Sequence, residues 1–367
     1  MSASRPNRPS NAPGWGAPLQ LVLRLLVMGL GLGVITGTAL KLLAPRLAGT
    51  GQPSPAPTAA LGLPGGSSLP RGLTLGRFEP RTELTALSQK WAQLAAVHKD
   101  LQASGYLLVL DVGRFAQLNP ERPLPAASSI KTPILLAGLE ELDAGRLRWN
   151  EPLTLTKEVI GGGAGWMASR PPGSRFPFWE AATEMIRVSD NSATNLLIKR
   201  LGGKASLNAR FQAMGLSATV VNNWLPDLDG TNTTSSLDLA RAIALVDTGE
   251  MLSPRARDLF REVMGTSRTN TLLPLGLLMG LGGDSATPDS DLLAHGVTVL
   301  NKTGDIGIAY ADGGLIQLPN GQRAVAAFMV KGPFNDQRST DLIRAMAAEV
   351  ARALIGKPGG AGPAATR

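Results

Sequence analysis

Cysteine is absent from this chain, and histidine is rare. The lack of any cysteine among the 367 residues excludes disulfides, thiolate catalysis and cysteine-ligated metals. The two histidines, His98 and His295, leave little material for a histidine metal site or a Ser-His-Asp triad. We therefore expect no metal site.

Strong clustering of positive charge is also absent. Lysine and arginine number 36 against 28 aspartates and glutamates, which gives a formal net charge of +8. Such an excess of positive charge can support binding to nucleic acid or to an anionic membrane. Here the basic residues are scattered, and only two tyrosines are present. This footprint is too weak for nucleic-acid binding, which we do not expect.

The N-terminal part of the chain predicts a membrane attachment. Residues 1–18 are polar and are interpreted as a disordered tail, whereas 19–43 are apolar apart from a few positions such as Arg24 and Lys41. The uncharged stretch 25–40 is short for a bilayer core of about 30 Å, but the two charged side chains can snorkel from its ends. We therefore predict one transmembrane signal anchor at 19–43, with the arginines of the tail held inside.

A cleaved signal peptide is the alternative, because Gly37, Thr38 and Ala39 offer small residues at a suitable spacing. Either interpretation exports the remainder of the chain. Residues 44–75 are dense in proline, glycine and serine, a composition that cannot bury a core and is typical of a linker. Residues 356–367 are interpreted as a second disordered tail.

The globular part is predicted between these segments, at residues 76–355. Helical periodicity is found at 77–103, 128–147, 179–201, 236–248 and 336–354, and strand patterns at 105–112, 115–118, 297–301, 306–318 and 323–331. The outer thirds thus supply strands and terminal helices, and the middle third is helical. This pattern predicts an α+β fold with an antiparallel sheet beside an all-α lobe.

Ser128 and Lys131 form the first candidate motif, Ser-Ser-Ile-Lys, at the start of a predicted helix. Residues three apart share a helix face, so the hydroxyl and the amine lie side by side. A lysine amine can take the serine proton if burial or another cation lowers its pKa, and the amides of the helix N-terminus can hold an oxyanion. Alone the pattern is weak, because a capping serine and a solvated lysine explain it equally well.

Two further tripeptides follow in the chain. Ser189-Asp190-Asn191 lies in a predicted helical stretch, and Lys302-Thr303-Gly304 ends an apolar run. Separately, the first fits a helix cap or break and the second a strand end with a turn glycine. Each exact tripeptide arises by chance in only about one chain in ten or fewer, so the three motifs in this order are far more specific than any one.

Together the motifs resemble those of the class A β-lactamases and related penicillin-binding acyltransferases, over roughly residues 77–354. The likeness extends to the Pro-Ala-Ala before Ser128 and to the run SDNSATNLL from Ser189, and the spacing of the two serines (189 − 128 = 61) is close to the family's. The resemblance implies a five-stranded antiparallel sheet flanked by N- and C-terminal helices, plus an all-α lobe, as in β-lactamases and transpeptidases. It implies neither a metal nor an organic cofactor.

The resemblance also implies a role for each residue of the first two motifs. Ser128 would be acylated, and Lys131 would help to deprotonate it. Ser189 would pass a proton to the departing nitrogen of the substrate. Asn191 would orient the substrate amide and the amine of Lys131.

The third motif would bind the substrate. By the same resemblance, Lys302 and Thr303 would hold the carboxylate that β-lactams and peptidoglycan stem peptides share. Gly304 would let the strand approach closely. The backbone amides of Asp305 and Ser128 would then form an oxyanion hole.

One segment departs from the family pattern. Class A enzymes carry a glutamate in a Trp-Glu-Pro-Glu-Leu-Asn type of loop, where it activates the water that releases the acyl group. Residues 224–229 here are WLPDLD, and Leu225 stands where that glutamate is expected. Asp227 and Asp229 are either carboxylates that make turn hydrogen bonds or a displaced base, and the sequence leaves both interpretations open.

The resemblance, together with Leu225 in place of the expected glutamate, leaves three functions open. We expect an active-site serine hydrolase that acylates Ser128 with β-lactams and is slow to deacylate. A D-Ala-D-Ala carboxypeptidase or peptidoglycan acyl-transfer enzyme is the first alternative, and a β-lactam receptor that does not turn over is the second. We expect a monomer, single-pass in the bacterial cytoplasmic (inner) membrane, with its catalytic domain in the periplasm or outside.

Overall fold

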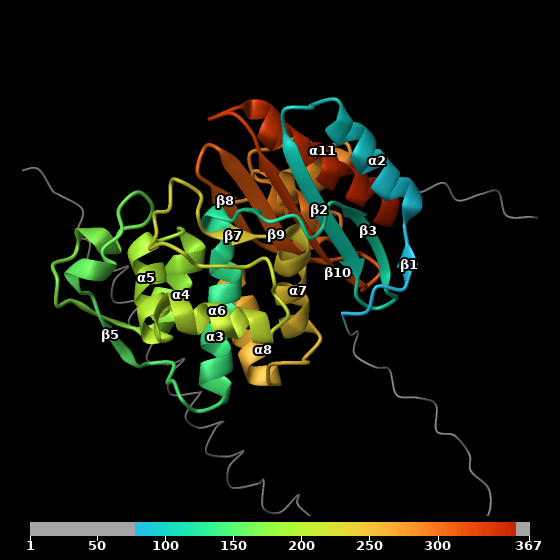
Figure 1. The fold of residues 1–367 in the computed structure, drawn as a ribbon. Helices are drawn as coiled ribbons and strands as arrows, with labels where there is room; N and C mark the ends of the chain where they lie inside the picture. The colour runs from blue at the N-terminus through green and yellow to red at the C-terminus, as the bar shows by residue number, and fades with distance from the viewer. Residues whose placement is uncertain (1–77, 357–367) are drawn as a thin grey trace, which may run out of the picture. The chain divides into compact units, whose positions relative to one another are not determined.

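A computed structural model describes residues 78–356, which form an α+β fold built on one six-stranded sheet (Figure 1). The strands lie in the order β1-β3-β2-β10-β9-β8. Their bounds are β1 Thr82–Glu83, β2 Gln102–Val109, β3 Arg114–Leu118, β8 Thr298–Asp305, β9 Ala309–Gln317 and β10 Arg323–Lys331. Short two-stranded ladders join β4 (Leu124–Pro125) to β7 (Thr233–Thr234) and β5 (Pro152–Thr154) to β6 (Arg175–Pro177).

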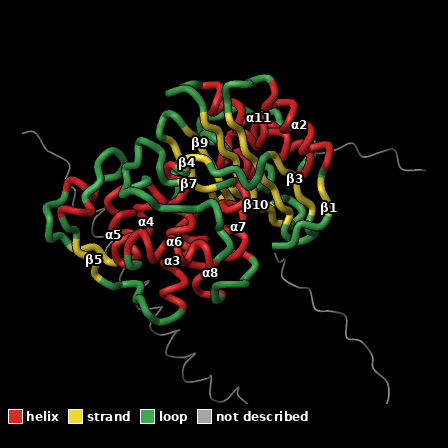
Figure 2. Tube along the Cα trace, in the orientation of Figure 1, coloured by secondary structure: helices red, strands yellow, loops and turns green. Residues whose placement is uncertain are grey.

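Helices cover both faces of the sheet, as the tube view also shows (Figure 2). On one face, α2 (Thr85–Ala96), α9 (Leu273–Gly280) and α11 (Gln337–Leu354) enclose one apolar core with the sheet, and α10 (Pro288–Ala294) packs on α9. On the other face, α7 (Ser236–Asp247) joins the sheet to the helical lobe. Because both faces are covered, β9 and β10 are buried along nearly their whole length.

The sheet has six strands, so the expected count of five is wrong. The additional strand is β1, which pairs in parallel with β3 through two residues only. Both are exposed, which leaves no hydrophobic alternation for a sequence pattern to detect. Backbone bonds alone define it: the amides of Arg81 and Thr82 donate to the carbonyl of Gly113.

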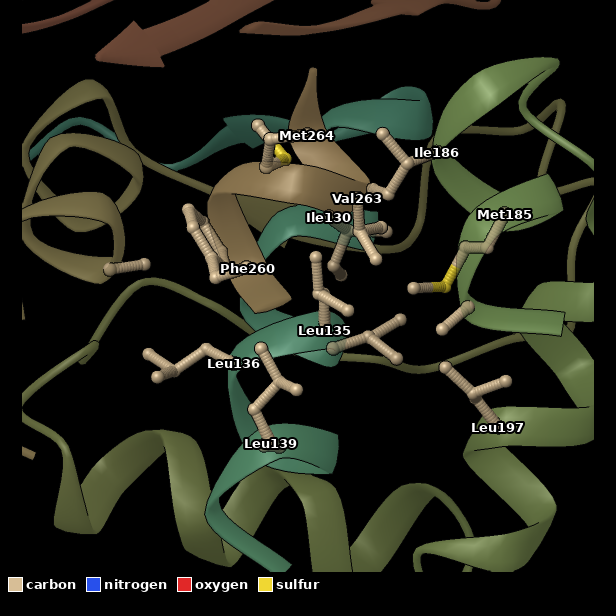
Figure 3. Close-up of a cluster of buried hydrophobic side chains, with 14 of the residues drawn as sticks. Ile130, Leu135, Leu136, Leu139, Met185, Ile186, Leu197, Phe260, Val263 and Met264 are labelled. Atoms are coloured by element: carbon tan, nitrogen blue, oxygen red, sulfur yellow. The ribbon is translucent and has the colours of Figure 1, made fainter. Parts of the chain in front are cut away.

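The helical lobe is organised around α3 (Lys131–Asp143), whose residues are buried on almost every side. Leu135, Leu136 and Leu139 meet apolar side chains from three other helices, which Figure 3 shows in close-up. The other helices of the lobe are α4 (Phe178–Arg187), α5 (Asn191–Arg200), α6 (Gly203–Ala213) and α8 (Pro254–Met264). Single 3₁₀ turns occur at η1 (Ala127–Ile130), η2 (Lys157–Val159) and η3 (Met167–Ser169). A helix buried this completely holds its N-terminal residues in a fixed place.

Several predicted segments lie outside the described residues. These are the tail at 1–18, the transmembrane segment at 19–43, the linker at 44–75 and all but the first residue of the tail at 356–367. Within the described range, none of the helices has the length and apolar character needed to cross a bilayer. The domain boundaries stay predictions.

Candidate active site

Ser128 lies in the 3₁₀ turn η1, immediately before α3, at the junction of the lobe and the sheet. Its side chain is partly open to solvent, whereas Lys131 one turn later is fully buried. Ala127, the residue before the serine, has a left-handed backbone with φ +46°. The turn therefore presents one reachable hydroxyl directly above a buried amine.

The amine of Lys131 lies at the centre of the first two motifs. Its Nζ is 2.9 Å from Ser128 Oγ, 2.9 Å from Ser189 Oγ, 2.7 Å from the carbonyl oxygen of Ser189 and 2.9 Å from Asn191 Oδ1. The structure thus brings together four residues of which Lys131 and Asn191 alone lie 60 positions apart in the sequence. All four contacts are of hydrogen-bond length.

The number of hydrogens on the Lys131 amine decides which atom donates in each of these contacts. Two of the four partners can only accept: the carbonyl of Ser189, and the Oδ1 of Asn191, whose Nδ2 is occupied in donating to the carbonyl of Gly162 at 2.8 Å. A neutral amine has two hydrogens, which these acceptors consume. Its lone pair then faces the hydroxyls of Ser128 and Ser189, either of which can donate to it. The arrangement is suited to moving a proton between the two serines through Lys131.

Burial favours the neutral form that this arrangement needs. Desolvation, and next the positive charge of Lys302, hold the pKa of Lys131 well below its usual value, while Asp190 acts in the opposite direction. A lowered pKa raises the fraction of neutral amine at neutral pH. Lys131 is therefore equipped to accept the proton of a serine hydroxyl.

Ser189 forms the joint between α4 and α5, which divides the stretch predicted as mostly helical at 179–201. Its backbone is left-handed, with φ +60°, a conformation that costs a non-glycine residue free energy and that concentrates at functional sites. The joint turns both the carbonyl and the hydroxyl of Ser189 toward Lys131. A continuous helix would have bonded that carbonyl to an amide instead.

Asp190, to which sequence reasoning gave no role, fixes the joint. Its Oδ1 caps α5 by accepting from the amide of Ala193 at 2.9 Å, and its Oδ2 accepts from the amides of Trp166 and Met167 at 2.7 and 2.8 Å. Aspartate at the first position before a helix is the signal that could have shown the cap. The loop contacts carried no local signal, because they join segments more than 20 residues apart.

The third motif lies at the end of β8, against the backbone of the nucleophile turn. A Cβ on Gly304 would lie 2.9 Å from the amide nitrogen of Ser128 and 2.8 Å from that of Ser129, too close for any real side chain. Glycine is thus required for this approach. It brings the Asp305 end of the strand alongside Ser128, and both residues line the same pocket.

Lys302 is the second buried cation of the site. Its Nζ donates to the carbonyl of Thr303 at 2.7 Å. Burial lowers the pKa of Lys302 to about 8, against the opposing effect of Asp312. At neutral pH it is mostly charged and can attract a carboxylate.

A pocket of about 190 Å³ opens in front of Ser128. Its lining includes Ser128, Asn191 and Asp305, together with part of the loop at 225–228. Leu225 lies here with only 5% of its surface exposed. Asn195 holds it in place, because the amide of Leu225 donates to Asn195 Oδ1 at 2.9 Å and its carbonyl accepts from Asn195 Nδ2 at 2.7 Å. The wall facing the serine on this side carries a methyl-rich side chain.

The two neighbouring carboxylates occupy different surroundings. Asp227 is nearly buried, and both of its oxygens accept from its own loop, from Thr231 Oγ1 at 2.8 Å and from the amide of Asn232 at 2.6 Å. Asp229 is exposed. The geometry thus favours the turn interpretation for Asp227. No group of three or more histidines, aspartates or glutamates in residues 78–356 is arranged to hold a metal ion.

The chain is similar to several known proteins. A family profile described as "Beta-lactamase enzyme family" matches residues 86–354. The extended-spectrum beta-lactamase PER-1 of Pseudomonas aeruginosa is 26% identical over 249 residues, which cover 64% of this chain and 76% of that protein.

Solved structures also match. PBP-A is 44% identical, with a TM-score of 0.69 over 75% of this chain and 98% of PBP-A. A leucine-to-glutamate mutant of PBP-A, solved as an acyl-enzyme complex with penicillin G, matches with a TM-score of 0.68. An ancestral class A beta-lactamase, 23% identical, matches with a TM-score of 0.62 over 73% of this chain and all of its own, which shows the shared fold.

Proposed function

The chain belongs to the beta-lactamase enzyme family, of the class A-like kind, and from this premise we propose that it forms an acyl-enzyme on Ser128 with β-lactams and releases it slowly. The observation that supports the first step most directly is the contact of Lys131 Nζ with the hydroxyls of Ser128 and Ser189. The buried, apolar Leu225 supports the second.

The residues of the site can supply and accept every proton that acylation moves. Ser128 Oγ attacks the lactam carbonyl carbon while its proton passes to the neutral amine of Lys131. The oxyanion is held by the backbone amides at Ser128 and Asp305. When the C–N bond breaks, Ser189 gives its proton to the nitrogen and regains one from the Lys131 ammonium. Lys302 and Thr303 hold the substrate carboxylate throughout.

On the side of the loop at 225–228, deacylation lacks a comparable group. It requires a water molecule that gives up a proton as it attacks the ester carbonyl, and Leu225 has no lone pair to receive that proton. Asp227 already accepts two hydrogen bonds from its loop. The acyl-enzyme complex of the leucine-to-glutamate mutant of PBP-A supports the view that relatives of this chain are acylated by penicillin.

Mixing the full-length protein with penicillin G should give a burst of one equivalent of acylated protein, followed by release over minutes or longer. Loss of a positioned base slows a step by roughly 10²- to 10⁴-fold, or about 3–5 kcal/mol of barrier. Intact mass followed over time measures both phases, since ring opening adds one whole penicillin. Steady turnover above about 1 s⁻¹ without accumulated adduct would contradict slow release. A protein that gains no mass would contradict acylation itself.

Cleavage of peptides ending in D-Ala-D-Ala is the second candidate. It uses the same acylation, and Leu225 favours it because peptide substrates of this kind need no glutamate on the loop. Release of D-alanine from such a peptide, abolished by prior treatment with penicillin G, would identify this as the working activity.

We also propose that the N-terminal segment at 19–43 stays attached and spans the membrane once, with the hydrolase domain outside the cytoplasm. The support is the apolar stretch flanked by Arg24 and Lys41 and followed by the linker. Membrane fractions washed at high pH should retain the full-length protein. Recovery of a soluble species beginning at Leu40 would instead identify a cleaved signal peptide.

A further inference from the structure

An open hollow adjoins the loop that borders the catalytic pocket, and its volume is about 390 Å³. The hollow is lined by Trp166, Arg170, Ser174, Arg175, Phe176 and Glu180. The loop at 161–167 contributes to both places, because Gly163 and Ala164 line the pocket in front of Ser128. Two residues of chain span at most about 7 Å, so the hollow begins close to the catalytic pocket.

Trp166 gives the hollow a fixed wall. Its amide donates to Asp190 Oδ2 at 2.7 Å, and its indole Nε1 donates to Glu184 Oε2 at 2.7 Å. The ring also meets that of Phe176 in a T-shaped contact, with the centroids 5.8 Å apart. The guanidinium of Arg170 lies over the indole, 5.4 Å from the ring centroid, which is within the range of a cation–π contact. The indole thus positions Arg170 without using its N–H groups.

Three charged side chains of the hollow have no hydrogen-bond or ion-pair partner among residues 78–356. These are Arg170, Arg175 and Glu180. Elsewhere in the lobe, Arg187 and Arg200 each form an ion pair with a glutamate. The two guanidiniums and the carboxylate line the same hollow, yet no ion pair joins them. All three charges are therefore available to a ligand.

This set of charges favours a ligand that carries both signs. A guanidinium binds a carboxylate through two parallel hydrogen bonds, and a carboxylate binds an ammonium. A ligand with only an anionic group would be attracted by Arg170 and Arg175 but repelled by Glu180. A ligand with only a cationic group would meet the reverse. An amino-acid end group, which presents a carboxylate and an ammonium together, is complementary to the hollow.

We propose that the hollow is a second substrate-binding site, which takes the free amine and carboxylate at the side-chain end of a diamino acid in a peptidoglycan stem peptide. The proposal rests on the proposed function, because the terminal D-alanines of that peptide would enter the catalytic pocket. Asn191, which would orient the substrate amide, lines that pocket beside Gly163 and Ala164. A peptide that extends beyond this amide can therefore pass the loop and reach the hollow.

The test measures the binding of two peptides that end in D-Ala-D-Ala to the full-length protein carrying Ser128→Ala, which cannot cleave them. One peptide contains meso-diaminopimelate with its side-chain amine and carboxylate free. The other contains L-lysine, which has the amine but lacks the carboxylate. Isothermal titration calorimetry at constant ionic strength gives both dissociation constants. The diaminopimelate peptide should bind about 10-fold more tightly or better, the scale of a hydrogen bond to a charged group.

Substitutions in the hollow assign the effect to its residues. Arg170→Gln and Arg175→Gln should each remove most of the preference for the diaminopimelate peptide. Glu180→Gln should weaken the binding of both peptides, since both carry the amine. The matched control is Arg255→Gln on α8, because Arg255 is exposed and its side chain also lacks a hydrogen-bond partner in the described part of the chain. It should keep the full preference. Circular dichroism checks the fold of each variant.

Four results would overturn the inference: equal affinity for the two peptides, a preference that survives both arginine substitutions, tighter binding in Glu180→Gln, or no measurable binding of either peptide. Tighter binding without Glu180 would identify a site for anions alone. Failure of the proposed function would be seen separately, as the absence of a penicillin G adduct on the protein that retains Ser128.

Discussion

Replacing Ser128 with alanine should abolish the penicillin adduct while leaving the fold intact. Ser128 is the partly exposed hydroxyl that contacts the buried amine of Lys131, and alanine at that position removes one oxygen atom without creating a clash. No covalent ester can form without it. Intact mass after incubation with penicillin G, with circular dichroism to check the fold, measures the outcome.

A second substitution tests Lys131 as the base. Lys131→Ala should slow acylation by a factor of roughly 100 or more, the scale of a lost general base. Ser129→Ala is the matched control, because Ser129 is adjacent and buried and its hydroxyl donates to the carbonyl of Ala126 at 2.6 Å rather than to the amine. It should acylate at the normal rate. An adduct on the Ser128→Ala protein, mapped to Ser129 or Ser189, would show that the nucleophile has been misassigned.

Leu225→Glu should speed release of the acyl group by roughly 10²- to 10⁴-fold, the range typical of one positioned base. The substitution places a carboxylate on the wall of the pocket that Ser128 shares, on a backbone that Asn195 clamps at both its amide and its carbonyl. The clamp fixes the direction in which the glutamate side chain leaves the backbone. Decay of the adduct mass after removal of free penicillin gives the rate.

The control for this substitution is Leu225→Gln, which matches glutamate in shape but cannot take a proton. It should release the acyl group as slowly as the wild type. Equal acceleration in both variants would mean that polarity or loosening of the loop, rather than a base, governs release. Fast turnover in the wild type that collapses in Asp229→Asn would show that the exposed aspartate is a displaced base.

Sequence reasoning reached the site because its residues form short, ordered motifs. The α+β class, the strands that became β2, β3, β8, β9 and β10, and the family are confirmed by the structure and the comparisons. The roles of the individual residues stay predictions. The geometry shows that Ser128, Ser189 and Asn191 all lie within hydrogen-bond distance of the amine of Lys131.

What the sequence could not show depends on contacts between distant segments. The pairing of β1 with β3 rests on backbone bonds from two exposed residues. Asp312 gave a faint signal, as an acid inside an otherwise apolar strand, but its partners come from β8 and from the start of α9. The left-handed turn at Ser189 could be expected only as a break in a helix, because capping residues do not specify its direction.

The two left-handed residues at the site, Ala127 and Ser189, bear differently on how this protein can adapt to heat. Each conformation costs on the order of 1–3 kcal/mol, which glycine would relieve. Glycine in place of Ala127 would give up one methyl group, whereas glycine in place of Ser189 would also give up the hydroxyl that contacts Lys131. Glycine at position 127 could therefore stabilise the protein against heat without removing a functional group. Glycine at position 189 could not, because the hydroxyl beside Lys131 would be lost.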